Sequence, residues 1–175
     1  MPVRPYTSER GTLSKNLSGA PSVCGPALLF ETCPGNEKVM DLYAEAAKYP
    51  FTYSLTTVVY NFMPNFTDFT IVKDELPGMN FSTIVDVNHY HTDLDNFSNI
   101  SEKSIQHYGA QIVPITREYL TNEVYADRDY FKAENDTVNF TIPALGLFNF
   151  SKGMYKVVNV IVFVLFLLAF AFEGV

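Results

Sequence analysis

The C-terminal stretch constrains the fold of this chain more than any other part of its sequence. The sixteen residues from Val157 to Phe172 carry no charge and only one polar side chain, Asn159. A helix needs roughly 20 apolar residues to cross a bilayer core, and about 17 at least. Starting at Met154 gives nineteen residues, because the long side chain of Lys156 can reach the headgroups. We therefore predict a transmembrane anchor over Val157–Phe172, with a lipid-anchor signal or a buried core element as the alternatives.

Composition limits what the rest of the chain can be. With 175 residues there is room for one domain and the anchor, and 47% hydrophobic against 18% charged residues is typical of a globular protein. The formal net charge is −7, and the chain has no run of Lys or Arg. An acidic surface repels phosphate backbones, so we exclude nucleic acid as a partner.

Asparagine gives the strongest indication of the compartment. Eight positions fit the acceptor pattern Asn-x-Ser/Thr, where chance would give roughly two, and all of them precede the predicted anchor. They predict N-glycosylation of a domain that faces the lumen or the outside of the cell. The predicted sites are Asn16, Asn65, Asn80, Asn96, Asn99, Asn135, Asn139 and Asn149.

Two features oppose this topology. Lys152 and Lys156 precede the anchor and only Glu173 follows it, which reverses the positive-inside pattern. The longest apolar run near the N-terminus is Ala27–Phe30, too short for a secretory signal peptide. A luminal domain would then require that a longer precursor supplies the signal. The alternative is a tail-anchored accessory subunit of an organelle membrane complex whose acceptor sites are unused.

The two cysteines, Cys24 and Cys33, flank a short stretch that begins with Gly25-Pro26. In an oxidising compartment such a pair is typical of a structural disulfide, which stabilises a fold by roughly 2–3 kcal/mol through loop closure. A redox pair would favour Cys-x-x-Cys spacing, which is absent here. We therefore predict a Cys24–Cys33 disulfide.

The pattern of apolar residues predicts a small mixed domain. From Asn36 to Lys48 apolar residues recur at helical spacing, and a second, short helix is expected over 101–108. Most of the remainder has the aromatic and β-branched residues that strands favour. The predicted strands are 51–62, 66–73, 80–88, 111–116 and 136–142. About five strands and one or two helices predict an α+β or mainly β fold, a small sandwich-like ectodomain, plus the one C-terminal transmembrane helix.

These patterns divide the chain into four parts. Residues 1–26 are rich in Ser, Pro and Gly and are predicted to be a disordered arm or linker. We expect the glycosylated ectodomain over 27–142, a membrane-proximal stalk over 143–156 and the transmembrane anchor over 157–172.

One short segment combines residue types that bind metals. His89, His91 and Asp93 alternate after the predicted strand 80–88, so a continuing strand would place them on one face. Imidazole and carboxylate side chains gathered in this way can hold a divalent metal. The segment resembles the His-x-His-x-Asp-His signature of metallo-β-lactamase-type hydrolases, although Leu94 stands in place of the last histidine. The resemblance implies a metal-dependent hydrolase with these three residues as ligands. The alternative is a polar exit from the strand.

Other catalytic patterns are absent from the sequence, which has no Gly-x-Ser-x-Gly elbow, phosphate-binding loop or His-Glu-x-x-His motif. We therefore expect a non-enzymatic, heavily N-glycosylated surface or envelope glycoprotein that acts by binding, shielding or assembly and uses no cofactor. Its expected partners are the membrane, through Val157–Phe172, and another membrane or surface protein that Asn159 would contact. The expected location is the plasma membrane, the secretory pathway or a virion envelope. A small metal-dependent hydrolase is the alternative function.

Overall fold

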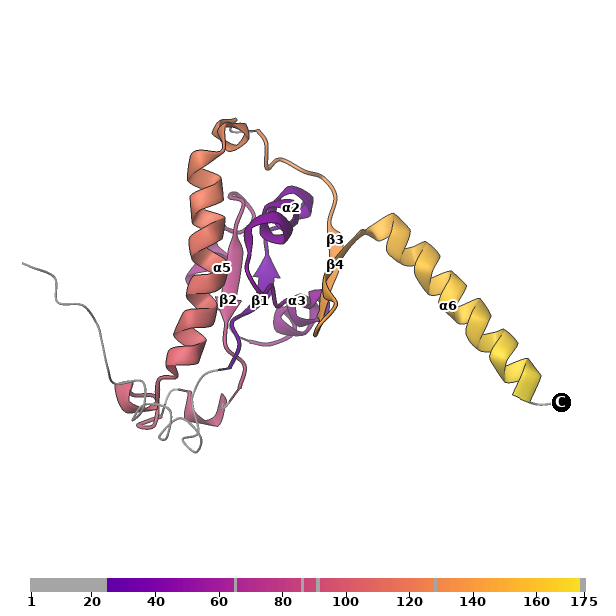
Figure 1. Ribbon diagram of the computed structural model, residues 1–175, viewed down its shortest axis with the longest axis horizontal. Coiled ribbons are helices and arrows are strands. Elements are labelled where there is room, and N and C mark those ends of the chain that lie inside the picture. The colour runs from indigo at the N-terminus through magenta and orange to yellow at the C-terminus, as the bar shows by residue number, and fades with distance from the viewer. Residues whose placement is uncertain (1–24, 65, 86, 91, 128, 174–175) are drawn as a thin grey trace, which may run out of the picture.

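The computed structural model describes residues 25–173 except 65, 86, 91 and 128. Figure 1 shows the sheet β1–β2 near the centre, α2, α3 and α5 around it, and the hairpin β3–β4 at one side, from which α6 leaves the domain. The elements are β1 (Leu28–Thr32), α2 (Glu37–Ala46), α3 (Ser54–Asn61), α4 (Asp68–Val72), β2 (Met79–Ser82), η1 (Val87–His89), η2 (Phe97–Asn99), α5 (Glu102–Thr121), η3 (Glu123–Ala126), β3 (Thr137–Ile142), β4 (Gly146–Ser151) and α6 (Lys152–Glu173).

The core is built around β1. This strand pairs antiparallel with β2, with Leu29 opposite Phe81. Leu29 forms the central hydrophobic cluster with Met40 and Tyr43 of α2, and Ile115 of α5 packs against that cluster. A two-stranded sheet is marginally stable alone, so these helices supply the apolar cover that it needs.

α2 confirms the helix predicted for 36–48. Its apolar residues form one stripe, and such a stripe stabilises a helix when it faces a core. The buried members are Val39, Met40, Leu42 and Tyr43. The chain enters α2 through Gly35, whose φ is 66°. A side chain there would place its Cβ 1.9 Å from the carbonyl oxygen of Ala133, so the position requires glycine.

Two predicted strands are helical instead. Residues 51–62 form a short extended part followed by α3, and residues 66–73 contain α4. The prediction was wrong because the strand preference of aromatic and β-branched residues depends on context, and tertiary contacts override it. In α3 the hydroxyls of Thr56 and Thr57 both donate to the Phe30 carbonyl of β1, at 3.2 and 2.8 Å. These hydrogen bonds hold the helix on the strand.

α5 covers both the predicted helix 101–108 and the predicted edge strand 111–116, so the second of these predictions was wrong. Pro114 lies inside α5 and cannot donate a backbone hydrogen bond to Ala110, four residues earlier. The Ala110 carbonyl instead accepts from Lys48 N at 3.1 Å. A residue just beyond α2 thereby compensates for the proline, and a local sequence pattern does not reveal such a contact.

β3 confirms the strand predicted for 136–142 and pairs along its whole length with β4. Residues 143–156, predicted as a stalk, therefore contain β4 and the start of α6. The hairpin is joined to the domain at Thr52. The Thr52 carbonyl accepts from Thr141 N at 2.9 Å, and the Thr52 hydroxyl donates to Asn139 Oδ1, also at 2.9 Å.

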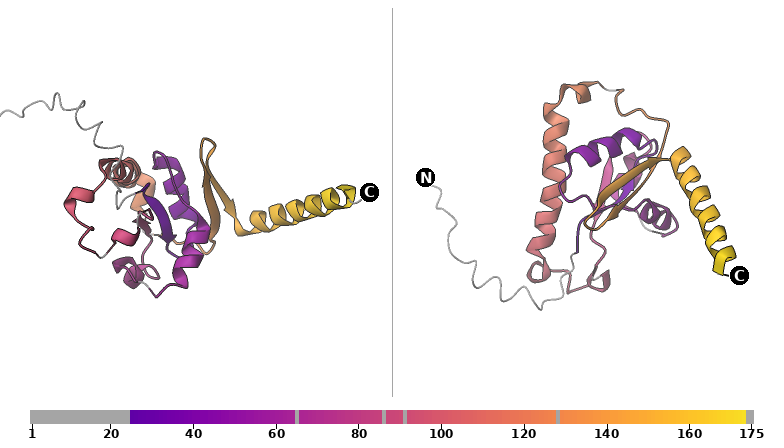
Figure 2. Two further views of the ribbon diagram at one scale, coloured as in Figure 1. Left: turned by 90° about the horizontal axis from the view of Figure 1, so that it is seen from below. Right: turned by 45° about the vertical axis from the view of Figure 1, so that its right-hand side comes forward.

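α6 follows β4 directly and points away from the domain in every view (Figures 1 and 2). The stretch Lys152–Phe172 has a mean hydropathy of 2.4 over its most apolar window, and none of that window is buried. Among the described residues it is the one helix long and apolar enough to cross a membrane, which supports the predicted membrane association. Asn159 donates to the Tyr155 carbonyl at 2.9 Å, so its amide is bonded within α6 itself.

The fold class agrees with the prediction in its coarser form, a small domain of mixed helix and sheet. The described residues contain four strands in two separate two-stranded sheets, instead of about five strands. The sandwich-like arrangement is not confirmed.

Candidate functional site

The segment after β2 contains the residues predicted to bind a metal. It does not continue the strand, because Val87–His89 form the short 3-10 helix η1. Thr92 closes the turn by donating its N–H and its hydroxyl to the His89 carbonyl, at 3.1 and 2.7 Å. Further along, Asn96 Nδ2 donates to the carbonyl of Asp93 at 2.6 Å. The loop is therefore shaped by its own polar side chains.

His89 is the buried member of the predicted set. It is 7% exposed, and its Nδ1 has no hydrogen-bond partner among the described residues. Leaving a buried polar atom unpaired costs about 1–3 kcal/mol, so this nitrogen is suited to a group that would bond to it. Asp93 is exposed, and His91 lies outside the described residues.

The described residues do not by themselves fit a metal ion. In the part of the chain that the structure describes, no three His, Cys, Asp or Glu side chains are grouped closely enough to hold one. A catalytic zinc takes three protein ligands and keeps a further position for water or substrate. The loop can therefore contribute ligands, but it does not complete a site.

His107, the remaining histidine, has a structural role. Its Nδ1 accepts from Ala27 N at 2.9 Å, so its Nε2 carries the proton and donates to the Tyr49 carbonyl at 3.1 Å. Gln111 beside it donates to the Ala27 carbonyl at 2.7 Å and accepts from the hydroxyl of Tyr43. This network fixes α5 to the start of β1 and to α2.

An apolar cavity of about 610 Å³ lies beside the loop, lined by residues of β1, β2 and α3 and by Tyr90. Tyr60 of α3 supplies a polar atom to this lining, because its hydroxyl is buried and has no partner among the described residues. Its ring packs edge-on against Phe30, with 4.8 Å between the ring centroids. The cavity suits an apolar group that also carries a hydrogen-bonding atom.

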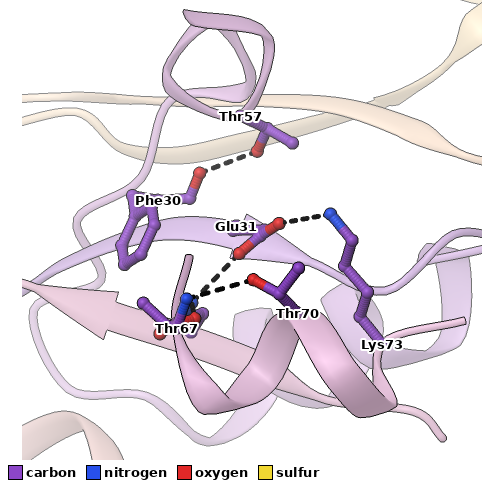
Figure 3. A network of polar contacts seen from close by, with 7 residues as sticks. Phe30, Glu31, Thr57, Thr67, Thr70 and Lys73 are labelled. Carbon is purple, nitrogen blue, oxygen red and sulfur yellow. Dashed lines mark hydrogen bonds and ion pairs between the residues drawn. The ribbon is translucent and has the colours of Figure 1, made fainter. Parts of the chain in front are cut away.

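A buried carboxylate on β1 was not predicted from the sequence. Glu31 of β1 is 1% exposed, and its carboxylate accepts from Lys73 Nζ at 2.7 Å and from Asn80 Nδ2 at 3.0 Å. Figure 3 shows the carboxylate between Lys73 on one side and Thr67 on the other. A buried carboxylate needs such partners. The available signal was one glutamate within an otherwise apolar run, which indicates a charge that the fold must pair.

A second, more polar pocket of about 390 Å³ includes Cys33 and Lys152. Cys33 is a buried free thiol, and its predicted partner Cys24 lies outside the described residues. The structure therefore shows no disulfide in the part of the chain that it describes, and the prediction of a disulfide bond is corrected to a free thiol at Cys33. Burial raises the pKa of this thiol, which favours its neutral form.

An ion pair borders this second pocket. Lys152 Nζ lies 2.6 Å from Asp136 Oδ2, and Gly35 N donates to Asp136 Oδ1 at 2.7 Å. Burial alone would raise the pKa of Asp136, but these hydrogen bonds and the Lys152 charge hold it below its ordinary value. The pair links the entrance of α2 to the start of α6.

The predicted glycosylation sites occupy different environments. Asn16 and Asn65 lie outside the described residues. Asn139 is 4% exposed and belongs to the packed interior. Asn80 is half-buried, and its amide donates to Glu31. The other sites, exposed or half-exposed, are Asn96, Asn99, Asn135 and Asn149. Glycosylation at these positions stays a prediction.

The class of the protein follows from comparison with known families. Residues 21–116 match the model of peptidase family M28, which is more than half of the chain. The chain therefore belongs to peptidase family M28. The matched residues contain the sheet β1–β2, the lining of the apolar cavity and the loop with His89, His91 and Asp93.

Two relatives extend the similarity toward α6. The chain is 29% identical to human endoplasmic reticulum metallopeptidase 1 over 151 residues, which cover 84% of the chain and 16% of that relative. It is 28% identical to the putative endoplasmic reticulum metallopeptidase 1-A of Caenorhabditis elegans over 150 residues, 83% of the chain and 17% of that relative. The chain thus spans less than a fifth of the length of these curated relatives. No solved structure matches the chain.

These findings overturn the expectation of a non-enzymatic surface or envelope glycoprotein. Membership of a peptidase family indicates an enzyme, and the relatives give no support to a viral envelope. The alternative of a metal-dependent hydrolase agrees better, although the family is M28 and not the metallo-β-lactamase type. The expectation failed because acceptor asparagines and an apolar helix indicate a compartment and carry no information about chemistry.

Proposed function

We propose that this chain forms part of a metal-dependent peptidase that acts at the membrane of the endoplasmic reticulum. The family match over residues 21–116 carries the proposal, since it includes both the apolar cavity and the histidine loop. The similarity to endoplasmic reticulum metallopeptidases over 84% of the chain supports the compartment as well as the reaction. Because the chain covers 16% of the human relative, the proposal concerns a part of such an enzyme.

The loop with His89, His91 and Asp93 is the candidate source of metal ligands. The unpartnered, buried Nδ1 of His89 supports this assignment. A bound zinc would act as a Lewis acid toward the scissile carbonyl and would lower the pKa of a bound water. Further ligands would come from outside the described residues or from another polypeptide, because the described residues hold no group of three.

The apolar cavity is this chain's own contribution to substrate binding. Its volume of about 610 Å³ accommodates a large apolar side chain of a peptide, and burying such a side chain contributes roughly 1.5–3 kcal/mol. The Tyr60 hydroxyl would bond to a polar atom of the same peptide. Tyr90 lines the cavity and neighbours both loop histidines in the sequence, so a bound side chain would lie next to the loop.

The orientation of the domain relative to the membrane would follow from α6 and the exposed acceptor asparagines. α6 would anchor the domain, and glycosylation of the exposed sites Asn96 and Asn135 would place it in the lumen. Gel mobility before and after enzymatic removal of N-glycans tests this topology. A downward shift on deglycosylation is expected, and unchanged mobility would place the domain on the cytosolic side.

Two histidine variants of the full chain, isolated from endoplasmic reticulum membranes, test the proposed reaction. Internally quenched peptides with large apolar residues are the substrates, and the rate is normalised to folded protein. His91→Ala should lose the hydrolysis, whereas His107→Asn should lower stability but keep the rate, since His107 only links α5 to β1 and α2. Hydrolysis that His91→Ala leaves unchanged would contradict the proposed ligand role.

A further inference from the structure

The solvent-facing side of α3 is apolar along its whole length. Leu55, Val58, Val59 and Phe62 are spaced i, i+3, i+4 and i+7, so they share one face of the helix. Their exposures are 69%, 52%, 52% and 85%. We call these four residues the α3 stripe. A helix at a protein surface usually turns such a stripe inward, so this orientation is unusual.

Hydrogen bonds fix this orientation. Thr56 and Thr57, on the opposite side of the helix, donate to the carbonyl of Phe30 in β1. Turning the α3 stripe toward β1 would break both bonds and leave that carbonyl without them. The polar side of α3 therefore faces β1. On its apolar side Leu55 and Val59 border the apolar cavity, whereas Val58 and Phe62 do not.

The chain segment that carries the stripe is free of charged residues. The sequence from Phe51 to Thr67 contains no Asp, Glu, Lys, Arg or His. Met63 and Phe66, which follow the helix, are 51% and 79% exposed and extend the apolar surface. Exposed apolar surface of this kind marks a contact with another protein or with a membrane, or a ligand-binding groove such as the cavity that Leu55, Val59, Met63 and Phe66 also line.

The position of α3 favours the membrane as the occupant of the exposed part of the stripe. Val58 and Lys152, the first residue of α6, line the same polar pocket. α3 also contacts β3 of the hairpin from which α6 leaves. Figure 2 shows α3 as the domain helix that lies nearest to α6. A bilayer that α6 enters would therefore begin next to α3.

We propose that the α3 stripe lies on the phospholipid bilayer that α6 enters, with its side chains at the boundary between headgroups and acyl chains. Short amphipathic segments bind there by burying an apolar face. α6 holds α3 close to the lipid, so a weak affinity suffices because the effective concentration is high. The contact depends on insertion of α6. It also adjoins the proposed substrate site, because Leu55 and Val59 belong to the α3 stripe and also line the apolar cavity.

The absence of tryptophan from the chain makes a direct test possible. Three single-tryptophan variants of the full chain are compared in phosphatidylcholine vesicles, with and without brominated acyl chains that quench tryptophan on contact. Phe62→Trp reports on the α3 stripe, and Phe166→Trp is the inserted reference in α6. Leu120→Trp is the aqueous reference, because Leu120 is 72% exposed on α5, which lies across the domain from α6 (Figure 1).

The Phe62→Trp variant should lose emission intensity in brominated vesicles, most strongly with bromine near the headgroup end of the chain. Phe166→Trp should lose intensity most strongly with bromine near the methyl end, and Leu120→Trp should lose none. Replacing Leu55 and Val59 by Ser in the Phe62→Trp background should reduce the quenching. If brominated lipid does not quench the emission of Phe62→Trp, the proposal is overturned. This also holds for blue-shifted emission, which would indicate that a protein covers the stripe. Unquenched Phe166→Trp would overturn the proposal as well, because α6 would then lie outside the bilayer.

Discussion

α2 and α3 flank the same strand, β1, and face the domain with opposite kinds of surface. In α2 the apolar residues point inward, and Met40 and Tyr43 are fully buried. In α3 the apolar residues point outward, and Leu55 and Phe62 are among the most exposed large side chains of the domain. Both sequences have helical spacing. The spacing therefore predicts an apolar helix face, and contacts with the rest of the domain decide whether that face is buried or exposed.

The difference also concerns what holds each helix in place. Burial of apolar side chains holds α2, at roughly 1.5–3 kcal/mol for each large side chain. Hydrogen bonds to the Phe30 carbonyl hold α3 on β1. The bond from Thr57 contributes about 0.5–1.5 kcal/mol. The bond from Thr56 contributes less, because this hydroxyl lies closer to the Tyr53 carbonyl, at 2.6 Å against 3.2 Å. The two helices should therefore respond to different substitutions.

The largest effect is expected on β1, the strand that both helices contact. Lys73→Met would leave the Glu31 carboxylate buried without its charged partner, which costs about 3–5 kcal/mol. Denaturant unfolding in detergent measures the loss. Glu31→Gln added to Lys73→Met should restore much of the stability, because the double variant buries no charge. A single variant as stable as the parent protein would contradict the assigned pairing.

Truncation of one apolar residue in each helix compares their burial directly. Met40→Ala should destabilise the protein by about 2–5 kcal/mol, because Met40 is fully buried in the central cluster. Leu55→Ala on the α3 stripe should change the unfolding free energy by less than about 0.5 kcal/mol. Equal losses for the two variants, measured by denaturant unfolding in detergent, would mean that α3 also packs through its apolar side.

Exchanging the polar and apolar positions of α3 tests what orients this helix. Thr57→Val removes the hydroxyl that donates to Phe30 and should cost about 0.5–1.5 kcal/mol. Val58→Thr, the reverse exchange at the next position, should cost less than about 0.5 kcal/mol, because Val58 is 52% exposed. Thermal unfolding of the two variants measures both losses of stability. A larger loss for Val58→Thr would reverse the assignment of the two faces.

The smallest effect concerns pH at the entrance of α2. The pKa of Asp136 is held below its ordinary value. A carboxyl group with a lowered pKa stabilises the fold above its unfolded pKa of about 3.9, and this stability is lost as the pH falls through the folded pKa. Asp136→Asn should therefore weaken the acid destabilisation seen in unfolding curves at falling pH. The Lys152 pair is partly exposed, so the difference should stay below about 1 kcal/mol.

A pH profile that Asp136→Asn leaves unchanged would assign the acid sensitivity to another group. Lys132→Gln is the matched control, because its ion pair with Asp129 is exposed and is not among the interactions that set the pKa of Asp136. That variant should unfold with the same pH dependence as the parent protein.

The comparison of α2 and α3 also explains which parts of the fold the sequence could predict. α2, β3 and α6 were predicted because each has one simple pattern: an apolar stripe, a β-branched run and an uninterrupted apolar helix. α3 contains the residues of a strand, and its helix depends on the Phe30 carbonyl, which lies far away in the sequence. α5 continues past Pro114 because Lys48 bonds to the freed carbonyl of Ala110. Contacts of this kind are invisible to local patterns.

The candidate site was predictable to a smaller extent. The residue types of His89, His91 and Asp93 indicated metal chemistry, and the family match supports that interpretation over the glycoprotein. The cavity lined by Tyr60 and Tyr90 was not predictable, because it forms between elements that the strand predictions had placed wrongly. At Cys33 the sequence predicted too much, because the short separation of the two cysteines suggested a bond that the structure does not show.

Metal removal and replacement show directly whether the protein is a metal-dependent peptidase. The protein is isolated from endoplasmic reticulum membranes, its metal content is measured, and hydrolysis of quenched peptides is followed before chelation, after chelation and after addition of zinc. Chelation is expected to abolish hydrolysis, and zinc is expected to restore it in proportion to the metal bound. Hydrolysis that persists in fully metal-free protein, or metal-loaded protein that cleaves no peptide, would contradict the proposed function.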